Sequence, residues 1–405
     1  MDQQAISTVN WQQNLKVAWL GNFFTGASFS LVMPFMALYV EDLGAPKNKV
    51  EWYAGLAVAI SALASAVFAP VWGRLADRYG RKPMMVRASF VMTFTMGGLA
   101  FIPNVHWLLF LRLLNGIFAG YVPNSTALIA SQAPNDKSGY ALGTLATGVT
   151  AGMLIGPLIG GVLAEMTGIR MVFLLVGLIL FVSTIMTVFF VKEDFEPVNR
   201  AQVVPTKIII KRVKSKQIML GLFVTSMIIQ ISAQSVAPIL SLYIRHLGQK
   251  ENLLFVSGLI VSSMGFSSLM SSSTLGKIGD RIGNHRLLLM ALFYSFVMYF
   301  FSALAQTSLQ LGLLRFAYGF GVGALMPSIN SLLTRITPRE GISRIFAFNQ
   351  MFTNLGQVIG PFIGSNVAII LGYRSVFYVT SLIVLINFLW SLINFRKYLK
   401  IKDIV

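Results

Sequence analysis

Arg112 stands inside a long apolar segment, residues 107–132, and is a charge in an unusual place. If that segment crosses a bilayer, the arginine costs about 2.5–3.5 kcal/mol on insertion scales, so we expect it to face a cavity or a partner. The alternative is a side chain that reaches the interface from the outer end of its segment. A second arginine, Arg315, occupies the same place in a later apolar segment, which favours a functional charge.

Two stretches of the chain repeat one pattern of glycine, aspartate and basic residues. Residues 73–83 read GRLADRYGRKP, and residues 276–286 read GKIGDRIGNHR. Gly80 allows a tight turn, and Asp77 can interact with a nearby helix N-terminus. A single copy would indicate only a basic turn, but two copies are a much more specific signal.

The composition places most of the chain in a membrane. Of 405 residues 55% are hydrophobic and 11% are charged, at a mean hydropathy of +0.71, whereas soluble proteins average about 25% charged residues. Crossing a bilayer takes roughly 20 apolar residues. Twelve such runs lie at 15–40, 51–73, 84–103, 107–132, 139–164, 170–191, 217–244, 252–276, 286–305, 309–334, 342–371 and 374–395. We expect an all-α integral membrane protein with twelve transmembrane helices.

The second half of the chain repeats the first. LYVEDLG at 38–44 recurs as LYIRHLG at 242–248, and further matches keep an offset of 203–204 to the last span. Each half has six spans, so the halves are parallel repeats, an arrangement that places a substrate between them. We expect six-helix bundles at 1–191 and 217–405 in pseudo-symmetric arrangement, joined by a basic cytoplasmic linker at 192–216.

Glycines at four-residue spacing mark the fifth span of each half. Gly152, Gly156 and Pro157 belong to the first copy, and Gly360 and Pro361 belong to the second. Such glycines let a neighbouring helix pack closely, and proline removes a backbone hydrogen bond. The pattern favours a pivot at the interface of the halves over ordinary packing, because it occurs twice.

These motifs together resemble the major facilitator superfamily, and within it the twelve-span drug:proton antiporters. The resemblance covers nearly the whole chain and implies an exporter that opens alternately to each side. It implies a conformational switch at Gly73, Asp77, Arg78, Gly80, Arg81 and Asp280 together with the fifth-span residues Gly152, Gly156, Pro157, Gly360 and Pro361. It also associates Arg112 with proton transfer. The implied cargo is lipophilic drugs such as fluoroquinolones and dyes, in exchange for protons.

Substrate contacts are expected on helical faces of the spans that line the cavity in this superfamily, and on the eleventh span. Stripes at spacings of three and four residues share a face. The candidates are Asn22, Phe29, Met33, Asn115, Phe118, Met227, Gln230, Gln234, Tyr318, Asn349 and Phe352. An apolar and aromatic wall with a few amides suits large lipophilic cations or zwitterions. For any one residue, ordinary helix packing is an equal alternative.

The sequence departs from many relatives in having no carboxylate in the middle of a span. Glu165 and the pair Glu41 and Asp42, near the ends of spans, are the candidates for protonation alongside Arg112. Solvated loop charge is the alternative, and for Glu41 and Asp42 it is favoured. Proton coupling is therefore implied by the family rather than by these residues.

Several classes of function are excluded or disfavoured. The absence of cysteine excludes disulfides, zinc fingers and thiol nucleophiles, and no metal, cofactor or enzymatic activity is expected. Two alternatives stay open: an exporter of a single endogenous solute, and a membrane receptor that has lost transport.

The net charge of +18 indicates membrane topology rather than a nucleic-acid partner. Of 32 Lys and Arg residues, 24 lie on one set of alternate loops and tails and 6 on the other, which is the positive-inside pattern. We expect a multi-pass protein of the inner or plasma membrane with both termini cytoplasmic. Arg396, Lys397, Lys400 and Lys402 are expected to contact anionic lipid, and the chain is expected to act as a monomer.

Overall fold

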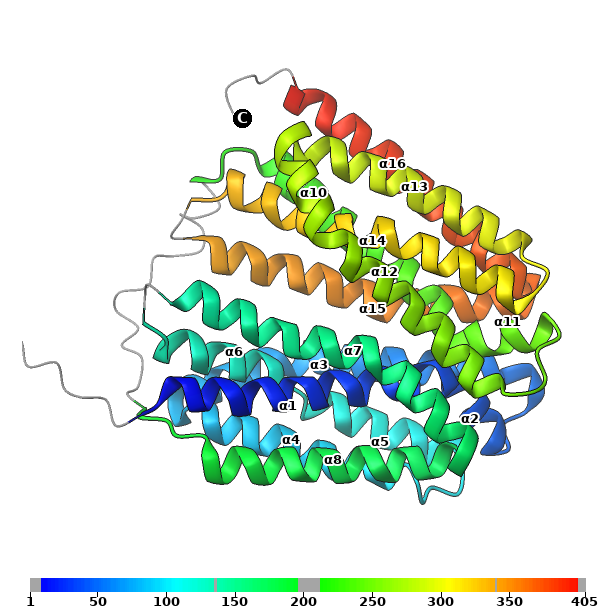
Figure 1. Cartoon of the computed structure of the whole chain (residues 1–405), viewed down its shortest axis with the longest axis horizontal. Helices are drawn as coiled ribbons and strands as arrows, with labels where there is room; N and C mark the ends of the chain where they lie inside the picture. The colour runs from blue at the N-terminus through cyan, green and yellow to red at the C-terminus, as the bar shows by residue number, and fades with distance from the viewer. Residues whose placement is uncertain (1–8, 135–136, 196–211, 339–340, 400–405) are drawn as a thin grey trace, which may run out of the picture. The chain divides into compact units, whose positions relative to one another are not determined.

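The structure is a computed structural model that describes residues 9–134, 137–195, 212–338 and 341–399. All regular structure in these ranges is helical (Figure 1). The elements are α1 (Trp11–Val32), η1 (Met33–Phe35), α2 (Met36–Asp42), η2 (Lys47–Lys49), α3 (Val50–Tyr79), α4 (Arg81–Gly98), α5 (Val105–Ile117), α6 (Tyr121–Gln132), α7 (Ser138–Thr167), α8 (Ile169–Phe190), α10 (Lys216–Val236), η4 (Ala237–Ile239), α11 (Leu240–His246), α12 (Leu253–Ile282), α13 (Asn284–Leu304), α14 (Ser308–Ile336), α15 (Ile342–Leu371) and α16 (Tyr373–Leu399).

The all-α membrane prediction is confirmed. Within the described ranges, eleven helices are long and apolar enough to cross a membrane. The predicted span at 84–103 corresponds to α4, which has 18 residues and carries Arg81, Lys82 and Arg87. These three basic residues lower its mean hydropathy, so the twelfth span stays a prediction.

Exposed apolar stripes on two helices identify surfaces that face lipid. On α8, Leu178, Val182, Ile185 and Phe189 are 40–72% exposed at spacings of four, three and four residues. The residues 204 positions later on α16 repeat the stripe: Leu382, Ile386, Leu389 and Ile393. Continuous apolar faces of this kind require a non-aqueous surrounding.

The first span of each repeat is interrupted at the same place. α1 passes through η1 into α2, and α10 passes through η4 into α11. Pro34 and Pro238 lie in these 3₁₀ segments. Since proline has no backbone N–H to donate, it weakens the α-helical ladder at this point.

The predicted loops after spans two and eight are shorter than expected. α3 continues to Tyr79 and α12 to Ile282, so all of residues 73–79 and 276–282 are helical rather than loop. The turns are confined to Gly80 and Gly283, both at φ +97°. No residue before these two glycines interrupts the helix. A positive φ of this size is easily adopted only by a residue without Cβ.

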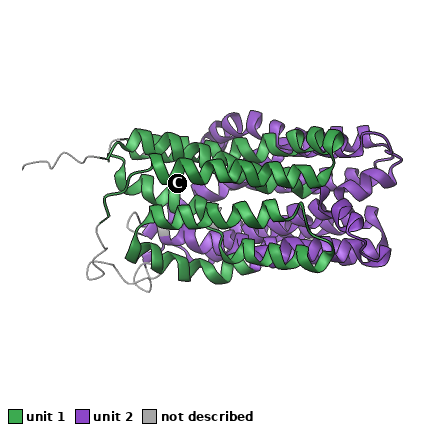
Figure 2. Cartoon of the chain, turned by 90° about the horizontal axis from the view of Figure 1, so that it is seen from below, with its two compact units in different colours: residues 1–33, 64–200 green, residues 34–63, 201–405 purple. Residues whose placement is uncertain are grey.

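The chain forms two compact units (Figure 2). Unit 1 comprises residues 1–33 and 64–200, and unit 2 comprises residues 34–63 and 201–405. The predicted domains at 1–191 and 217–405 differ from these units in the assignment of 34–63 and remain a prediction. Residues 196–211 of the predicted linker lie outside the described residues.

Each unit is built from the same helix pairs. In unit 1, α1 lies beside α7 and α4 beside α8 (Figure 1). In unit 2, the corresponding pairs are α10 with α15 and α13 with α16. The sequence repeat is therefore also a repeat of packing.

Candidate functional site

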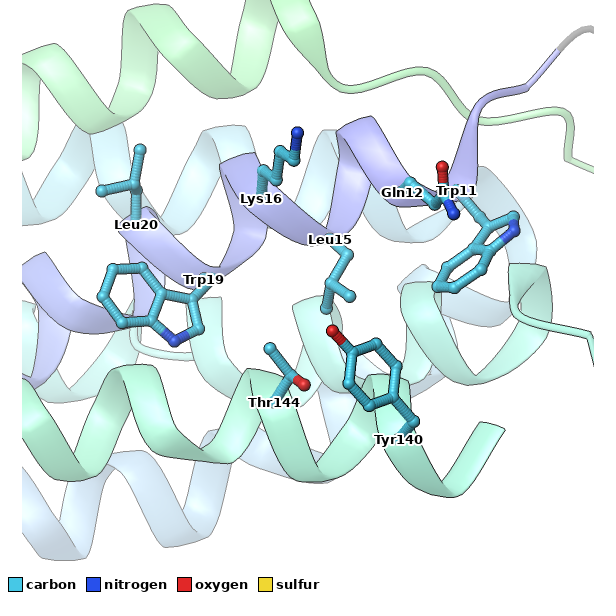
Figure 3. Close-up of a pocket in the computed structure, with 8 residues that line it drawn as sticks. All are labelled: Trp11, Gln12, Leu15, Lys16, Trp19, Leu20, Tyr140 and Thr144. Atoms are coloured by element: carbon cyan, nitrogen blue, oxygen red, sulfur yellow. The ribbon is translucent and has the colours of Figure 1, made fainter. Parts of the chain in front are cut away.

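An open hollow of about 670 Å³ lies along α1 and α7 in unit 1 (Figure 3). Its lining residues are Trp11, Gln12, Leu15, Lys16, Trp19, Leu20, Tyr140 and Thr144. The Trp19 indole N–H donates to the Thr147 hydroxyl at 2.9 Å, which fixes that ring. Small-molecule sites are typically about 300–1,000 Å³, so the volume and the aromatic walls suit a flat apolar compound.

None of the predicted substrate residues lines this hollow. The prediction concentrated on the middle of the spans, whereas the hollow lies at the beginning of α1. A signal was present in the sequence: Trp11, Leu15 and Trp19 recur at four-residue spacing on one helical face.

The three predicted substrate residues of span one differ in burial. Asn22 is 1% exposed, and its Oδ1 accepts from the Ser125 hydroxyl of α6 at 2.8 Å. The Asn22 Nδ2 has no hydrogen-bond partner within the described part of the chain. Phe29 is 36% exposed and Met33 is half-buried, so these two are the more accessible members of the stripe.

Span four is broken where the sequence predicted a continuous helix at 107–132. α5 ends at Ile117 and α6 begins at Tyr121, with Gly120 at φ +134° between them. The Trp72 indole donates to the Ile117 carbonyl at 2.6 Å. Arg87 donates to the carbonyls of residues 118 and 119 at 3.3 and 3.1 Å and lies 3.5 Å from the Trp72 ring centre.

The predicted substrate residues of span four lie on either side of this region. Asn115 donates to the Thr95 hydroxyl at 3.0 Å, and the Phe118 ring lies 5.5 Å from that of Trp72. Discontinuous helices in transporters often line binding sites, because only protein or a cavity can satisfy their free backbone groups.

In unit 2 the predicted residues lie on α10, α14 and α15. Gln234 is buried and Gln230 half-buried, and a Cβ at Gly360 or Gly356 would meet their Cβ atoms at 2.8 Å. The Phe352 ring lies 5.4 Å from Phe223. Two more of the predicted substrate residues are at least partly buried: Asn349 is 7% exposed, and Met227 is half-buried.

Both intramembrane arginines are covered by protein. Arg112 on α5 is 2% exposed, and Arg315 on α14 is 5% exposed. The Arg315 guanidinium lies 5.5 Å from the ring centre of Tyr318 and 5.8 Å from that of Tyr299. Two of the carboxylates that were predicted to carry the proton, Glu165 on α7 and Asp42 on α2, are exposed, unlike the arginines.

An ion pair in unit 2 joins equivalent positions of the two repeats. Arg245 on α11 donates to both carboxylate oxygens of Glu41 on α2, at 2.6 and 3.3 Å. The two residues are 204 positions apart, which is the repeat offset. Nearby, the Tyr373 hydroxyl donates to Glu51 at 2.6 Å. The sequence contained the signal, since opposite charges follow the matching Leu-Tyr pairs, but the pairing was not predicted.

The first copy of the charged motif is organised around Asp77 and Glu193. Asp77 pairs with the Arg81 side chain at 2.6 Å, rather than with a helix N-terminus. The Glu193 carboxylate instead accepts from the backbone N–H groups of Arg81 and Lys82, both at 2.7 Å, at the beginning of α4. Gly73 lies within α3, and the exposed Arg78 lies 5.3 Å from the ring centre of Tyr79.

The second copy uses different partners. Asp280 accepts from Asn284 at 3.4 Å and lies 3.8 Å from Arg335, which comes from the end of α14. The carboxylate at the motif is thus paired in both copies, with Arg81 in one and Arg335 in the other.

The glycine stripes pack against the first long helix of their own repeat, which is α1 for α7 and α10 for α15. A Cβ at Gly152 would lie 2.7 Å from the Ala27 nitrogen of α1, and one at Gly156 would lie 3.1 Å from the Ala27 carbonyl oxygen. Pro157 is buried beside them. On α15, Gly360 approaches α10 in the same way, and Pro361 is also buried.

Comparison with known proteins gives a consistent result. The sequence matches the Major Facilitator Superfamily over residues 18–308 and 222–402. It is 60% identical to the multi-drug resistance efflux pump PmrA of Streptococcus pneumoniae, over 98% of this chain and 100% of that protein. It is 57% identical to a PmrA homolog of Lactococcus lactis, over 98% of each chain.

The fold also matches a solved transporter structure. A bacterial homolog of the human lysosomal transporter Spinster, in an inward-facing and unoccupied conformation, aligns with a TM-score of 0.80 at 13% identity, over 96% of this chain and 98% of that one. The family match and the close relatives also mean that the protein is a transporter rather than an enzyme. The chain belongs to the Major Facilitator Superfamily.

Proposed function

We propose that this protein exports lipophilic drug-like compounds in exchange for protons by alternating access. The Glu41–Arg245 ion pair carries the mechanistic part of the proposal. Residues at equivalent positions of two parallel repeats meet only near the axis that relates the repeats, so this contact closes one end of a pathway along that axis. Opening that end requires the pair to separate.

The hollow supports an opening at the other end of the same span. Trp11–Asp42 forms one span; the hollow takes residues from its first ten positions, and Glu41 lies at its end. A transporter in one resting state has one end closed and the other accessible. The names of the relatives, which are multidrug efflux pumps, support drugs as cargo.

The proposed substrate contacts combine the hollow with the predicted stripes. Phe29, Met33 and Phe118 offer apolar surface, and Asn115 and Gln230 offer amides. Apolar side chains with a few amides bind flat lipophilic compounds, including dyes and fluoroquinolones, through dispersion and burial rather than through a fixed set of hydrogen bonds.

Proton coupling is proposed for Arg112, Glu165 and Asp42. Arg112 is covered by protein within its span, where a cation strongly affects any carboxylate that approaches it. The exposed positions of Glu165 and Asp42 allow protons to enter from solvent.

The architecture proposed for this cycle has twelve spans in two bundles, with α4 as the third span. The charge asymmetry of the loops supports cytoplasmic termini in the cell membrane, and one chain acts as a monomer. The side chains of Arg396 and Lys397, and the whole of Lys400 and Lys402, lie outside the described residues, so the anionic-lipid contact stays a proposal.

The test measures ethidium and fluoroquinolone accumulation in cells that express the protein, with and without a protonophore. We expect lower accumulation on expression and loss of this effect when the proton gradient collapses. Unchanged accumulation would favour a single endogenous solute or a receptor, and export that survives the protonophore would assign another driving force. Vector-only cells are the control.

A further inference from the structure

Arg315 is a buried cation with unused hydrogen-bond donors. Its Nε and Nη1 have no partner among the residues that the structure describes, although the side chain is 95% covered. The rings of Tyr318 and Tyr299 lie 5.5 and 5.8 Å away and stabilise the charge in part. An aromatic face does not accept a hydrogen bond as an oxygen does. Since buried N–H groups are almost always hydrogen-bonded, these two donors require an acceptor.

The helices around Arg315 supply no carboxylate for it. Between Leu253 and Leu399, the described residues include one acid, Asp280. Asp280 pairs with Arg335, and twenty residues of α14, about 30 Å of helix, separate Arg335 from Arg315. Of the other described acids of unit 2, Glu41 is engaged by Arg245 and Glu51 by the Tyr373 hydroxyl. Asp42 and Glu251 are exposed, whereas Arg315 is buried.

The two tyrosines are held in place by their own contacts. Their hydroxyl oxygens are 3.1 Å apart, and the Tyr299 hydroxyl lies 3.2 Å from the Ser232 carbonyl oxygen of α10. Their ring centres are 4.7 Å apart. Both rings belong to one apolar cluster, whose other members include Val236, Ile239, Ile260 and Leu311.

This arrangement belongs to the second repeat alone. At the positions equivalent to Tyr299 and Tyr318, the first repeat has Met96 and Asn115. The two tyrosines therefore have no equivalent in the sequence of the first repeat.

We propose that Arg315, Tyr299 and Tyr318 form a binding site for the carboxylate of an amphipathic aromatic compound. The guanidinium donates charge-assisted hydrogen bonds to the carboxylate, and the tyrosine rings and apolar cluster accept the aromatic body. This inference rests on the proposed export function and assigns it a substrate class: aromatic acids and zwitterions bind here through their acid group.

The test measures binding to the purified full chain in detergent. The probes are a zwitterionic fluoroquinolone, its methyl ester, and ethidium, which has no carboxylate. We expect the native protein to bind the acid at least about tenfold more tightly than the ester, because the ester lacks the charge that pairs with Arg315. We expect Arg315→Gln to remove this preference and to leave ethidium binding within about twofold.

Arg286→Gln is the matched control, since it removes one exposed arginine from α13, the helix that carries Tyr299. It should retain the preference. A native protein without preference for the acid, or an Arg315→Gln variant that retains it, would overturn the proposal. Equal losses for acid and ethidium would also overturn it, because they indicate a structural role.

Two further measurements keep the proposal testable. If Arg315→Gln does not fold, Arg315→Lys keeps the charge but changes the geometry of the donors; it should weaken binding of the acid more than binding of the ester or of ethidium, and equal changes for all three probes would contradict the site. Extrusion of ethidium from proteoliposomes under an imposed proton gradient tests the export function by itself, so the two failures are distinguishable.

Discussion

Glu41 and Arg245 are both partly open to solvent, with side chains 34% and 43% exposed. Exposed ion pairs contribute about 0.2–1 kcal/mol, which corresponds to a change of less than about tenfold in an equilibrium. A contact that must break in every transport cycle benefits from such a small energy, because a stronger pair would hold one state too long. We therefore regard this pair as one that biases the closed state rather than one that locks it.

Reversing one charge of the pair is expected to slow export. Arg245→Glu places two carboxylates at the contact, so the end that the pair closes should open more readily. The double variant Glu41→Arg with Arg245→Glu restores opposite charges and should recover most of the export rate. Ethidium efflux per unit of protein measures both. A double variant no better than the single ones would show that the charges do not act through each other.

Arg112 is expected to be required for coupling and not for folding. Arg112→Ala should abolish proton-driven export of ethidium while the protein remains in the membrane. Exchange of ethidium without a gradient should continue in proteoliposomes, since Arg112 itself is not among the proposed substrate contacts. Normal pumping by a well-expressed variant would contradict the proposed role of Arg112.

At the scale of helices, the glycines of α7 allow a test of whether close packing against α1 is needed for export. Gly156 faces Ala27 of α1, with an added Cβ only 3.1 Å from the Ala27 carbonyl oxygen, whereas an added Cβ at Gly143 of the same helix meets no described atom within 4 Å. Overpacking of a tight contact typically costs about 1–3 kcal/mol. The two glycines therefore form a matched pair on one helix.

Gly156→Leu should lower export strongly, and Gly143→Leu should leave it unchanged. Efflux per unit of membrane-inserted protein separates a defect in turnover from a defect in insertion. If Gly156→Leu protein is instead absent from the membrane, the stripe serves packing alone and its role as a pivot is wrong.

The helices could be predicted because hydrophobic length and periodicity act locally. Every predicted run overlaps a helix or a pair of helices, and the matched stretches 38–44 and 242–248 both begin within a short helix, α2 in the first repeat and α11 in the second. The break in span four could not be predicted this way, because it depends on donors from other helices. Trp72 and Arg87 satisfy its carbonyls, and the second repeat has Leu275 and Met290 at those positions and an unbroken α14.

The site residues were harder to predict, because a helical stripe does not say what covers it. Asn22 and Gln234 are buried against neighbouring helices, whereas Trp11 and Trp19 line the hollow without having been predicted. Glu193 was missed for the same reason: it follows span six in the sequence but contacts the beginning of α4. Contacts between distant segments are set by packing, and the sequence alone does not give that packing.

At the scale of the whole molecule, the proposed alternating-access cycle predicts that α2 and α11 separate each time a substrate is exported. The protein contains no cysteine, so introduced cysteines are the only reactive thiols in the chain. Glu41→Cys with Arg245→Cys places one thiol on each of these helices, which pack against each other in this structure. A thiol-specific cross-linker with a reducible disulfide in its spacer can then join them.

Cross-linking this pair should stop export, because the closed end can no longer open, and reduction of the spacer should restore it. Each single-cysteine variant, treated with the same reagent, controls for modification without linkage and should continue to export. The measurement is ethidium efflux from proteoliposomes before treatment, after treatment and after reduction. Export that persists in fully cross-linked protein would mean that the substrate passes without separation of these helices, and the alternating mechanism proposed for this chain would be wrong.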